Sequence, residues 1–276
     1  MARRSFRTGL VAGALTLGVI ATGCGSSDSG SSDEGKVFTD YAWLSDSGTN
    51  TSFDPGVVQT LSESQITTAL YDGLTDFDFS DPEKPELKGD VAESWEANDD
   101  ATEFTFKIRD GVTFSDGSPV LPSSFKSGWE RAGSPELASP YGYLINNVKG
   151  GAAWNSGCLD AEPPEKAEDC KEKVDPSKGL EAIEADDDAM TLKVTLEAPN
   201  ADFPSIVSHP FFSPVDAKDL EKIGNKTGWG TKGLTVGNGP FKPESANSKE
   251  VVLVPNTKWD GNVLGDTKVK LDKLVF

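Results

Sequence analysis

Residues 103–117 read Glu-Phe-Thr-Phe-Lys-Ile-Arg-Asp-Gly-Val-Thr-Phe-Ser-Asp-Gly, and this stretch says most about the fold. Apolar and polar side chains alternate over 103–108, which is the pattern of a strand with one buried face. Asp-Gly pairs follow at 110–111 and 116–117, and this dipeptide is a strong signal for a hairpin turn. The stretch therefore predicts a strand at 103–108 and a second short strand at 112–114 that forms a hairpin with it.

Helices and further strands are predicted on both sides of this hairpin. A capping sequence at Ser62-Glu-Ser-Gln65 begins a helix that ends near residue 71 or 72, with Ile66 and Leu70 on its apolar face. A second helix is predicted at 123–131, where two aromatic residues are spaced four apart. Alternating or apolar runs predict strands at 37–44, 190–196, 251–254 and 269–276. Strands and helices mixed in this way indicate an α/β protein.

Composition excludes several classes of function. The chain has 276 residues, 26 Lys and Arg against 45 Asp and Glu, and a formal net charge of −19. That charge repels phosphate backbones, so no nucleic-acid partner is expected. One His leaves little for metal or acid–base chemistry, and no Gly-x-Ser-x-Gly or phosphate-loop motif is present. We therefore expect no catalytic residues, no metal site and no cofactor.

The N-terminus has the pattern of an export signal. Basic residues precede an apolar run at 10–20 that is too short to span a bilayer. Ala21-Thr-Gly-Cys24 follows and resembles the lipobox of bacterial lipoproteins. Residues 1–23 are thus predicted to be a lipoprotein signal peptide, with Cys24 lipidated and residues 24–36 a flexible tether. An ordinary secreted protein is the alternative, and both the general secretory and the twin-arginine routes stay open.

Two further cysteines, Cys158 and Cys170, flank a polar run. An oxidising compartment outside the cytoplasm favours a local disulfide between them. Two free thiols are the alternative, and the spacing does not fit a Cys-x-x-Cys metal or redox motif. We expect the disulfide to order the insertion that carries it.

Several short blocks follow one another along the chain: Ser52-Phe-Asp-Pro55, Leu70-Tyr-Asp-Gly-Leu74, Val91-Ala-Glu-Ser-Trp95, Phe104 to Phe114 with Asp116-Gly117, Ala138-Ser-Pro-Tyr141, Leu192-Lys-Val-Thr-Leu196, Ser208 to Pro214 and Asn238-Gly-Pro-Phe241. Taken in this order, they resemble the family 5 solute-binding proteins of ABC transporters, the peptide and nickel class. The resemblance is greatest to the oligopeptide-binding lipoproteins and runs from about residue 37 to the end. One departure is Val-Leu-Pro-Ser at 120–123, where the family usually has Thr-Ala-Glu-Asp at the start of a helix.

The resemblance implies a clamshell of the type II periplasmic-binding-protein class, an α/β fold with two lobes. Residues 37–74 and 217–276 would form an incomplete lobe I, and residues 75–216 a subdomain inserted into it. The second lobe would be missing, since the chain covers about the N-terminal half of such a protein. The apolar strand that ends the chain at 269–276 likewise suggests a truncated protein.

The resemblance also implies a function. The protein would be exported, lie on the outer face of the cell membrane or in the periplasm, capture oligopeptides as a monomer and deliver them to the permease of an ABC importer. No enzymatic activity is implied. Alternatives are the same fold with another ligand, such as a nickel complex, haem or an oligosaccharide, or a peptide-sensing surface receptor that does not take part in transport.

The ligand-binding residues are expected at places that match the family. Gln59, Thr60 and Leu61 correspond to the extended stretch that hydrogen-bonds the peptide, mainly through the backbone; an ordinary loop into a helix is the alternative. Tyr141 and Tyr143 resemble an aromatic segment facing the cleft, although either could pack in the core. His209 matches a position on the cleft wall, where a purely structural imidazole is the competing interpretation.

Overall fold

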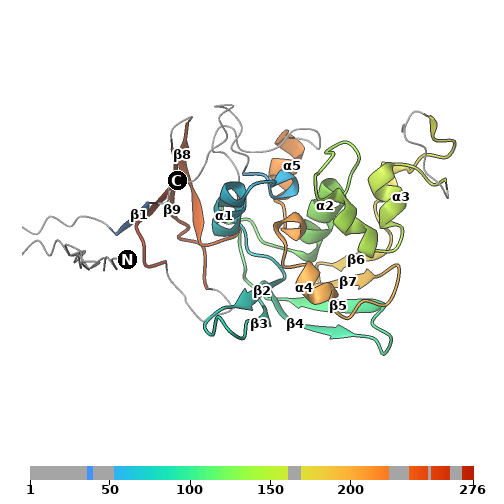
Figure 1. Cartoon of the computed structure of the whole chain (residues 1–276), viewed down its shortest axis with the longest axis horizontal. Coiled ribbons are helices and arrows are strands. Elements are labelled where there is room, and N and C mark those ends of the chain that lie inside the picture. Colours follow the sequence, from blue (N-terminus) through green and yellow to red (C-terminus); the bar gives the residue numbers. More distant parts are fainter. Residues whose placement is uncertain (1–35, 40–52, 161–168, 224–235, 248–249, 262–268) are drawn as a thin grey trace, which may run out of the picture. The chain divides into compact units, whose positions relative to one another are not determined.

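The computed structural model describes residues 36–39, 53–160, 169–223, 236–247, 250–261 and 269–276 (Figure 1). These residues belong to the unit Gly35–Phe276. The predicted signal peptide, Cys24 and the tether up to residue 35 lie outside the described residues. Among the helices that are described, none has the length and apolar character that crossing a bilayer requires.

A four-stranded antiparallel sheet forms around the stretch quoted first. Its strands, in spatial order, are β4 (Ala92–Ala97), β5 (Glu103–Ile108), β7 (Thr191–Thr195) and β6 (Ile183–Asp186). The apolar and polar residues that alternate in the sequence point to opposite faces of the sheet. Phe104, Phe106 and Ile108 are buried, while the residues between them are half-buried. The predicted strands at 103–108 and 190–196 are confirmed.

The predicted hairpin between 103–108 and 112–114 is wrong. Strand β5 pairs with β4 on one side and β7 on the other, so neither edge is free for residues 112–114. Those residues instead turn back on themselves, with Thr113 forming an antiparallel bridge to Pro119 around Gly117, whose φ is 93°. Phe114 is fully buried and fills the core. The six-residue β4, which precedes β5 along the chain, and the five-residue β7, from a distant part of it, outcompete a three-residue strand at 112–114.

A second sheet brings both ends of the described chain together. Its order is β1 (Val37–Thr39), β10 (Lys273–Val275), β9 (Val251–Pro255) and β8 (Phe241–Ala246), with β1 parallel to β10. The predicted strand at 251–254 is confirmed. The strand predicted at 37–44 is present at 37–39, and residues 40–44 lie outside the described residues. The strand predicted at 269–276 is shorter than predicted and covers 273–275. A separate hairpin joins β2 (Thr75–Asp78) to β3 (Glu86–Gly89).

Helix α1 (Leu61–Leu70) follows an extended segment at 58–60. Its N-cap is Thr60, which forms a capping box with Glu63, and not the predicted Ser62 with Gln65. Thr60 has the extended backbone that an N-cap needs, whereas Ser62 lies inside the first turn and is buried. The apolar face is as predicted, because Ile66 and Leu70 are fully buried, and the helix ends at 70 as expected.

Helix α2 (Pro122–Ala132) confirms the helix predicted at 123–131. Pro122 occupies the first turn, where its missing N–H costs nothing, so the departure from the family sequence at 120–123 still begins a helix there. The remaining helices and 3₁₀ turns are η1 (Pro55–Val57), η2 (Gly142–Asn147), α3 (Gly151–Ser156), η4 (Pro176–Lys178), α4 (Phe203–Ile206), η5 (Pro210–Phe212) and α5 (Ala217–Ile223).

The buried apolar side chains fall into two clusters. The larger one contains the aromatic contacts of Trp129 with Phe203 and Phe212 and includes the four-stranded sheet around β5. The smaller one joins α1 to β8 and β9 and contains Phe53 and Phe241. At the edge of the larger cluster, Cys158 and Cys170 are joined by a disulfide.

Candidate functional site

The predicted backbone-binding stretch immediately precedes and begins α1. Leu61 is 77% exposed, although its side chain is apolar. The N–H groups of Gln59 and Thr60 both donate to Glu63 Oε2, each at 3.0 Å. Two amide donors of this stretch are therefore already used by the helix cap. A ligand here would meet the side chain of Leu61 and backbone carbonyl groups in preference to these donors.

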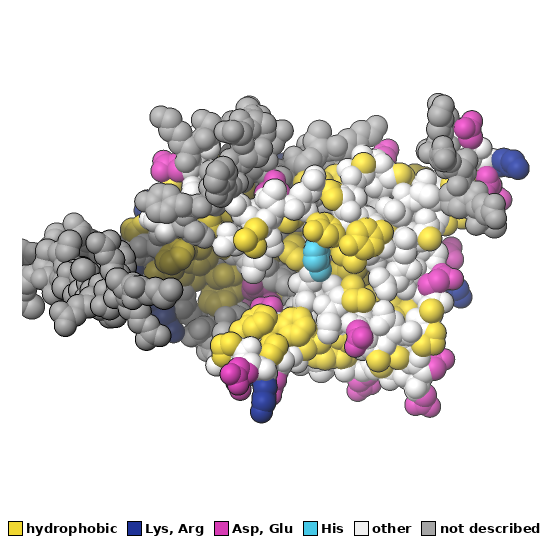
Figure 2. Space-filling model, in the orientation of Figure 1, with side chains coloured by type: hydrophobic (Ala, Val, Ile, Leu, Met, Phe, Trp, Pro, Cys, Tyr) yellow, Lys and Arg dark blue, Asp and Glu magenta, His cyan; other side chains and the backbone are white. Residues whose placement is uncertain are grey.

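The two tyrosines and the histidine form one cluster. The ring of Tyr141 lies 4.7 Å from the ring of His209 and 6.2 Å from that of Tyr143, measured between centroids. Tyr143 is 57% exposed, whereas Tyr141 is half-buried and packs against the larger core cluster. Figure 2 shows the only histidine at the surface, next to apolar side chains. The structure thus places three of the predicted residues together, with Tyr143 the one most open to a ligand.

His209 is held in one orientation by its own turn. It is the N-cap of η5, and its Nδ1 accepts a hydrogen bond from the N–H of Phe211 at 3.1 Å. Burial lowers the pKa of the His209 imidazole. The ring is therefore neutral at pH 7, and the proton sits on Nε2 because Nδ1 is an acceptor. Within the described part of the chain Nε2 has no hydrogen-bond partner, so it is a donor available to a carbonyl oxygen.

The aromatic cluster and the start of α1 lie on neighbouring elements. The η5 turn, which His209 begins, packs against both η1 and α1. Turn η1 is fixed in place by Asp54, whose carboxylate caps the N–H of Gly56 at 2.9 Å. The structure therefore gathers Tyr141, Tyr143 and His209 in one cluster and places Gln59, Thr60 and Leu61 at the N-terminus of α1.

Sequence reasoning missed the residue that fixes this arrangement. Arg131 of α2 forms two hydrogen bonds to the Asp54 carboxylate, at 2.9 and 2.6 Å, and both side chains are buried. The pair connects η1 to α2 across 77 residues of sequence. No signal in the sequence pointed to it, because a residue two positions after Trp129 lies on a different face of the helix from the apolar pair Phe125 and Trp129.

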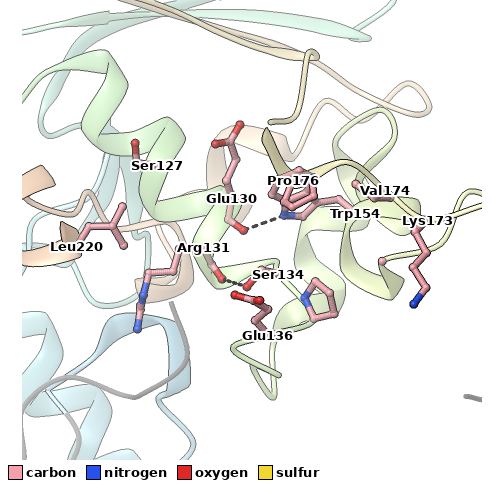
Figure 3. A pocket seen from close by; sticks show the side chains of 12 residues that line it. Ser127, Glu130, Arg131, Ser134, Glu136, Trp154, Lys173, Val174, Pro176 and Leu220 are labelled. Carbon is pink, nitrogen blue, oxygen red and sulfur yellow. Dashed lines mark hydrogen bonds between the residues drawn. The ribbon is translucent and has the colours of Figure 1, made fainter. Parts of the chain in front are cut away.

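A separate cavity of about 310 Å³ lies along α2 and α3. Figure 3 shows Trp154 and Pro176 on one side of it and Arg131 and Leu220 on the other. Glu130, which lines the cavity, already has a hydrogen-bond partner, because its Oε1 accepts a hydrogen bond from the N–H of Leu180 at 2.8 Å. None of the predicted ligand residues lines this cavity, so it is distinct from the candidate site.

Among the described residues, Cys158, Asp160 and Cys170 are the only group of three or more His, Cys, Asp or Glu side chains whose possible ligand atoms lie within 4.8 Å of one another. The two sulfur atoms of that group are joined to each other. A disulfide offers no thiolate, so this group has no ligand set for a metal.

Comparison with known proteins gives a consistent result. Residues 86–276 match the model of the bacterial extracellular solute-binding proteins, family 5. The dipeptide-binding protein DppE of Bacillus subtilis is 32% identical over 235 residues, covering 84% of this chain and 38% of the relative. The periplasmic oligopeptide-binding protein OppA of Escherichia coli is 33% identical over 211 residues, covering 76% of this chain and 35% of the relative.

Solved structures show the same likeness. The Escherichia coli murein tripeptide-binding protein MppA superposes with a TM-score of 0.69 at 26% identity, over 88% of this chain and 42% of that one. OppA of Listeria monocytogenes bound to peptide gives 0.67 at 26% identity, over 88% and 42%. The chain spans between a third and a half of the length of these proteins.

Proposed function

The chain belongs to the bacterial extracellular solute-binding proteins of family 5, and from this premise we propose that it is part of an extracytoplasmic protein that captures oligopeptides for an ABC importer. Its fold is the α/β fold of that family over 88% of its length, as predicted. The relatives that it matches are named as binding proteins, which supports a binding function without catalysis.

The observation that carries the proposal is the extent of similarity to relatives named for peptides. DppE and OppA match 84% and 76% of this chain, a span that includes most of the described residues. The candidate site agrees in chemistry. Exposed Leu61 and Tyr143 offer apolar contact, and Nε2 of His209 offers one donor to a peptide carbonyl. Main-chain hydrogen bonds combined with roomy apolar surfaces suit ligands of variable sequence.

The division into lobes is part of the proposal. Residues 37–74 with 217–276 would form lobe I, and residues 75–216 its inserted subdomain. The two buried clusters support this division, because the smaller one draws on both ends of the chain and the larger one on residues 74–212. A second lobe, as in relatives more than twice as long, would close over the peptide.

Export and membrane attachment complete the proposal. The signal peptide at 1–23, the lipidated Cys24 and the tether would hold the protein outside the cytoplasm, near its permease. Relatives named as periplasmic support export. Lipidation is tested by mass spectrometry of the membrane fraction, where a Cys24→Ser variant should lose the acyl mass.

A ligand screen with matched variants tests the function. We expect tri- to pentapeptides to bind and to be recovered unchanged, while nickel complexes, haem and oligosaccharides do not bind. Tyr143→Ala should weaken peptide binding about tenfold, equivalent to ~1.4 kcal/mol. Leu159→Ala is the control, since Leu159 is similarly exposed (51% against 57%) and lies outside the site. Binding of another ligand class alone, or hydrolysis of the peptides, would refute the proposal.

A further inference from the structure

The cavity along α2 and α3 is separate from the predicted peptide site, and we refer to it as the α2–α3 cavity. Its apolar wall is made by Trp154 of α3, Pro176 of η4 and Leu220 of α5, with Pro135 and Val174 from the segments between helices. Figure 3 shows Trp154 and Pro176 across the cavity from Leu220. At about 310 Å³ the cavity is at the lower end of the volumes of small-molecule sites, which suits a ligand of one or two rings.

Most polar groups of the wall are bonded within the protein. Trp154 is only 7% exposed, and its Nε1 donates to the backbone carbonyl of Glu130 at 2.8 Å. The hydroxyl of Ser134 donates to the carbonyl of Arg131, also at 2.8 Å, and the guanidinium of Arg131 pairs with Asp54. Figure 3 marks the first two of these bonds. A ligand with many polar groups would lose its hydration here without gaining partners, so the cavity favours a largely apolar ligand.

One hydroxyl of the lining is unused. Ser127 of α2 is half-buried, and no described residue forms a hydrogen bond with its Oγ. A serine hydroxyl can both donate and accept a hydrogen bond. Lys173 also has no ion pair with a described residue, but it is exposed, so its ammonium group stays hydrated. Ser127 therefore offers one polar contact to a ligand that carries one polar group.

The charges around the cavity favour a neutral ligand. Oε1 of Glu130 lies 3.7 Å from Nζ of Lys126, and the charge of Arg131 is neutralised by its buried partner. Glu136 and Lys173, which are both exposed, carry opposite charges. Neither sign of charge is in excess among these groups. The charge of an ionic ligand would therefore be poorly compensated next to the apolar wall.

The disulfide between Cys158 and Cys170 holds one wall of the cavity. Cys158 forms an antiparallel bridge with Lys173, and the N–H of Val174 donates to the carbonyl of Gly157 at 3.1 Å. Gly157, Lys173 and Val174 all line the cavity. The covalent bond and the hydrogen bond thus fix two segments of the wall relative to each other. A preformed wall lowers the entropy cost of binding a ligand.

We propose that the α2–α3 cavity is a second binding site, which takes a neutral aromatic molecule of one or two rings with a single hydroxyl group. The rings pack against Trp154, Pro176 and Leu220, where ring contacts and apolar burial stabilise the complex. The ligand hydroxyl bonds Oγ of Ser127. This inference goes beyond the proposed function, because none of the predicted peptide-binding residues lines the cavity.

Three naphthalene derivatives test the class of ligand on the full chain, by calorimetry at pH 7. They are 2-naphthol, which is neutral, 2-naphthoate, which is an anion, and 2-naphthylmethylammonium, which is a cation. We expect 2-naphthol to bind at least about tenfold more tightly than either ion, because the charge of each ion is poorly compensated in the cavity.

Substitutions in the wall locate the bound 2-naphthol, with circular dichroism as the check that each variant folds. Ser127→Ala should weaken its binding about fivefold, the effect of one hydrogen bond. Ser94→Ala, at an exposed serine of β4, is the control and should leave the affinity unchanged. Leu220→Trp puts a larger side chain into the cavity and should abolish binding. If Leu220→Trp does not fold, Ser127→Trp fills the cavity from α2 in its place.

Competition with peptides keeps this site apart from the peptide site. Tri- to pentapeptides should not displace 2-naphthol, and failure of those peptides to bind would refute the proposed function but not this inference. The α2–α3 cavity is overturned as a site for neutral aromatic molecules if 2-naphthol does not bind, if either ion binds as tightly, if peptides displace it, or if binding survives in the filled cavity. An unchanged affinity in Ser127→Ala overturns the assigned hydroxyl contact.

Discussion

At the residue scale, the ion pair of Asp54 and Arg131 decides whether the candidate site is assembled. Both side chains are almost completely removed from solvent, with 0% and 2% of their side-chain surfaces exposed. Neither charge recovers its lost hydration unless the other is present, and removal of one partner from such a pair typically costs 3–5 kcal/mol. Because the pair connects η1 to α2, its loss also frees the segment that carries Gln59 and Leu61.

We expect Arg131→Met and Asp54→Asn each to lower the free energy of unfolding by about 3–5 kcal/mol, measured by urea denaturation. The double variant should lose clearly less free energy of unfolding than the sum of the two single losses, since it leaves no buried charge without its partner. Lys193→Met is the control. It breaks the Lys193–Glu103 pair, whose side chains are both 38% exposed, and should cost less than about 1 kcal/mol. Strictly additive losses at Asp54 and Arg131 would contradict this interpretation.

In the sequence, Asp54 was noted only as part of the block Ser52-Phe-Asp-Pro55, and Arg131 was not selected. A turn is a local feature, and Asp-Pro predicts it from adjacent residues. The partner of a buried charge depends on which helix packs nearby, 77 residues away in the chain. The same limit applies to Asp90, because a single sequence shows an acidic residue before a strand but not that the fold buries it.

At the element scale, the sequence predicted helix α1 correctly but not the residue that caps its N-terminus. Periodicity correctly predicted the helix and its buried face, but two Ser/Thr-x-x-Glu/Gln patterns overlap there, and only backbone conformation selects Thr60 with Glu63. The strand at 103–108 is a second example. Its alternation predicted the element, but the Asp-Gly signals after it did not predict its partners, which are β4, just before it in the chain, and β7, far after it.

The cap at Thr60 gives a test at this scale. Thr60 Oγ1 accepts the N–H of Glu63 at 3.2 Å, and loss of an N-cap side chain typically costs about 1 kcal/mol. We expect Thr60→Ala to lower the free energy of unfolding by that amount. It should also weaken peptide binding, because Gln59 and Leu61 flank the cap. Thr68→Ala, at an exposed position inside the same helix, should change stability by less than about 0.5 kcal/mol. Equal effects of the two variants would show that the cap does not stabilise α1.

At the scale of the whole molecule, the pairing of β1 with β10 and the division of the core into two clusters came from no local pattern. Neither strand is more than three residues long, and they are 233 or more residues apart in the chain. The family resemblance implied a lobe built from both ends of the chain, and the comparisons support that fold over 88% of the sequence. Recognition of ordered motifs thus identified the fold class, which periodicity alone could not, whereas the division into lobe I and an inserted subdomain stays a prediction.

The buried acids also make the stability of the whole molecule depend on pH. Burial raises the pKa of Asp72, Asp90 and Glu130 above that of an unfolded chain. The folded state therefore holds protons that the unfolded state releases above pH 4, and their stabilising effect is lost as pH rises through the folded values of about 7 and 9. His209 acts in the opposite direction: its lowered pKa removes stability as pH falls below about 6.5.

We therefore expect the free energy of unfolding, measured by urea denaturation at each pH, to be highest at about pH 4 to 5 and to fall from there towards pH 9. The loss should exceed about 1.4 kcal/mol, the equivalent of one pKa unit. Asp90→Asn should flatten this slope and stabilise the protein at pH 8, because the amide does not ionise. Asp99→Asn should leave the slope unchanged, since Asp99 is exposed. Stability that rises from pH 6 to pH 9 would show that the folded protein stabilises the ionised carboxylates of Asp72 and Asp90, which would contradict this prediction.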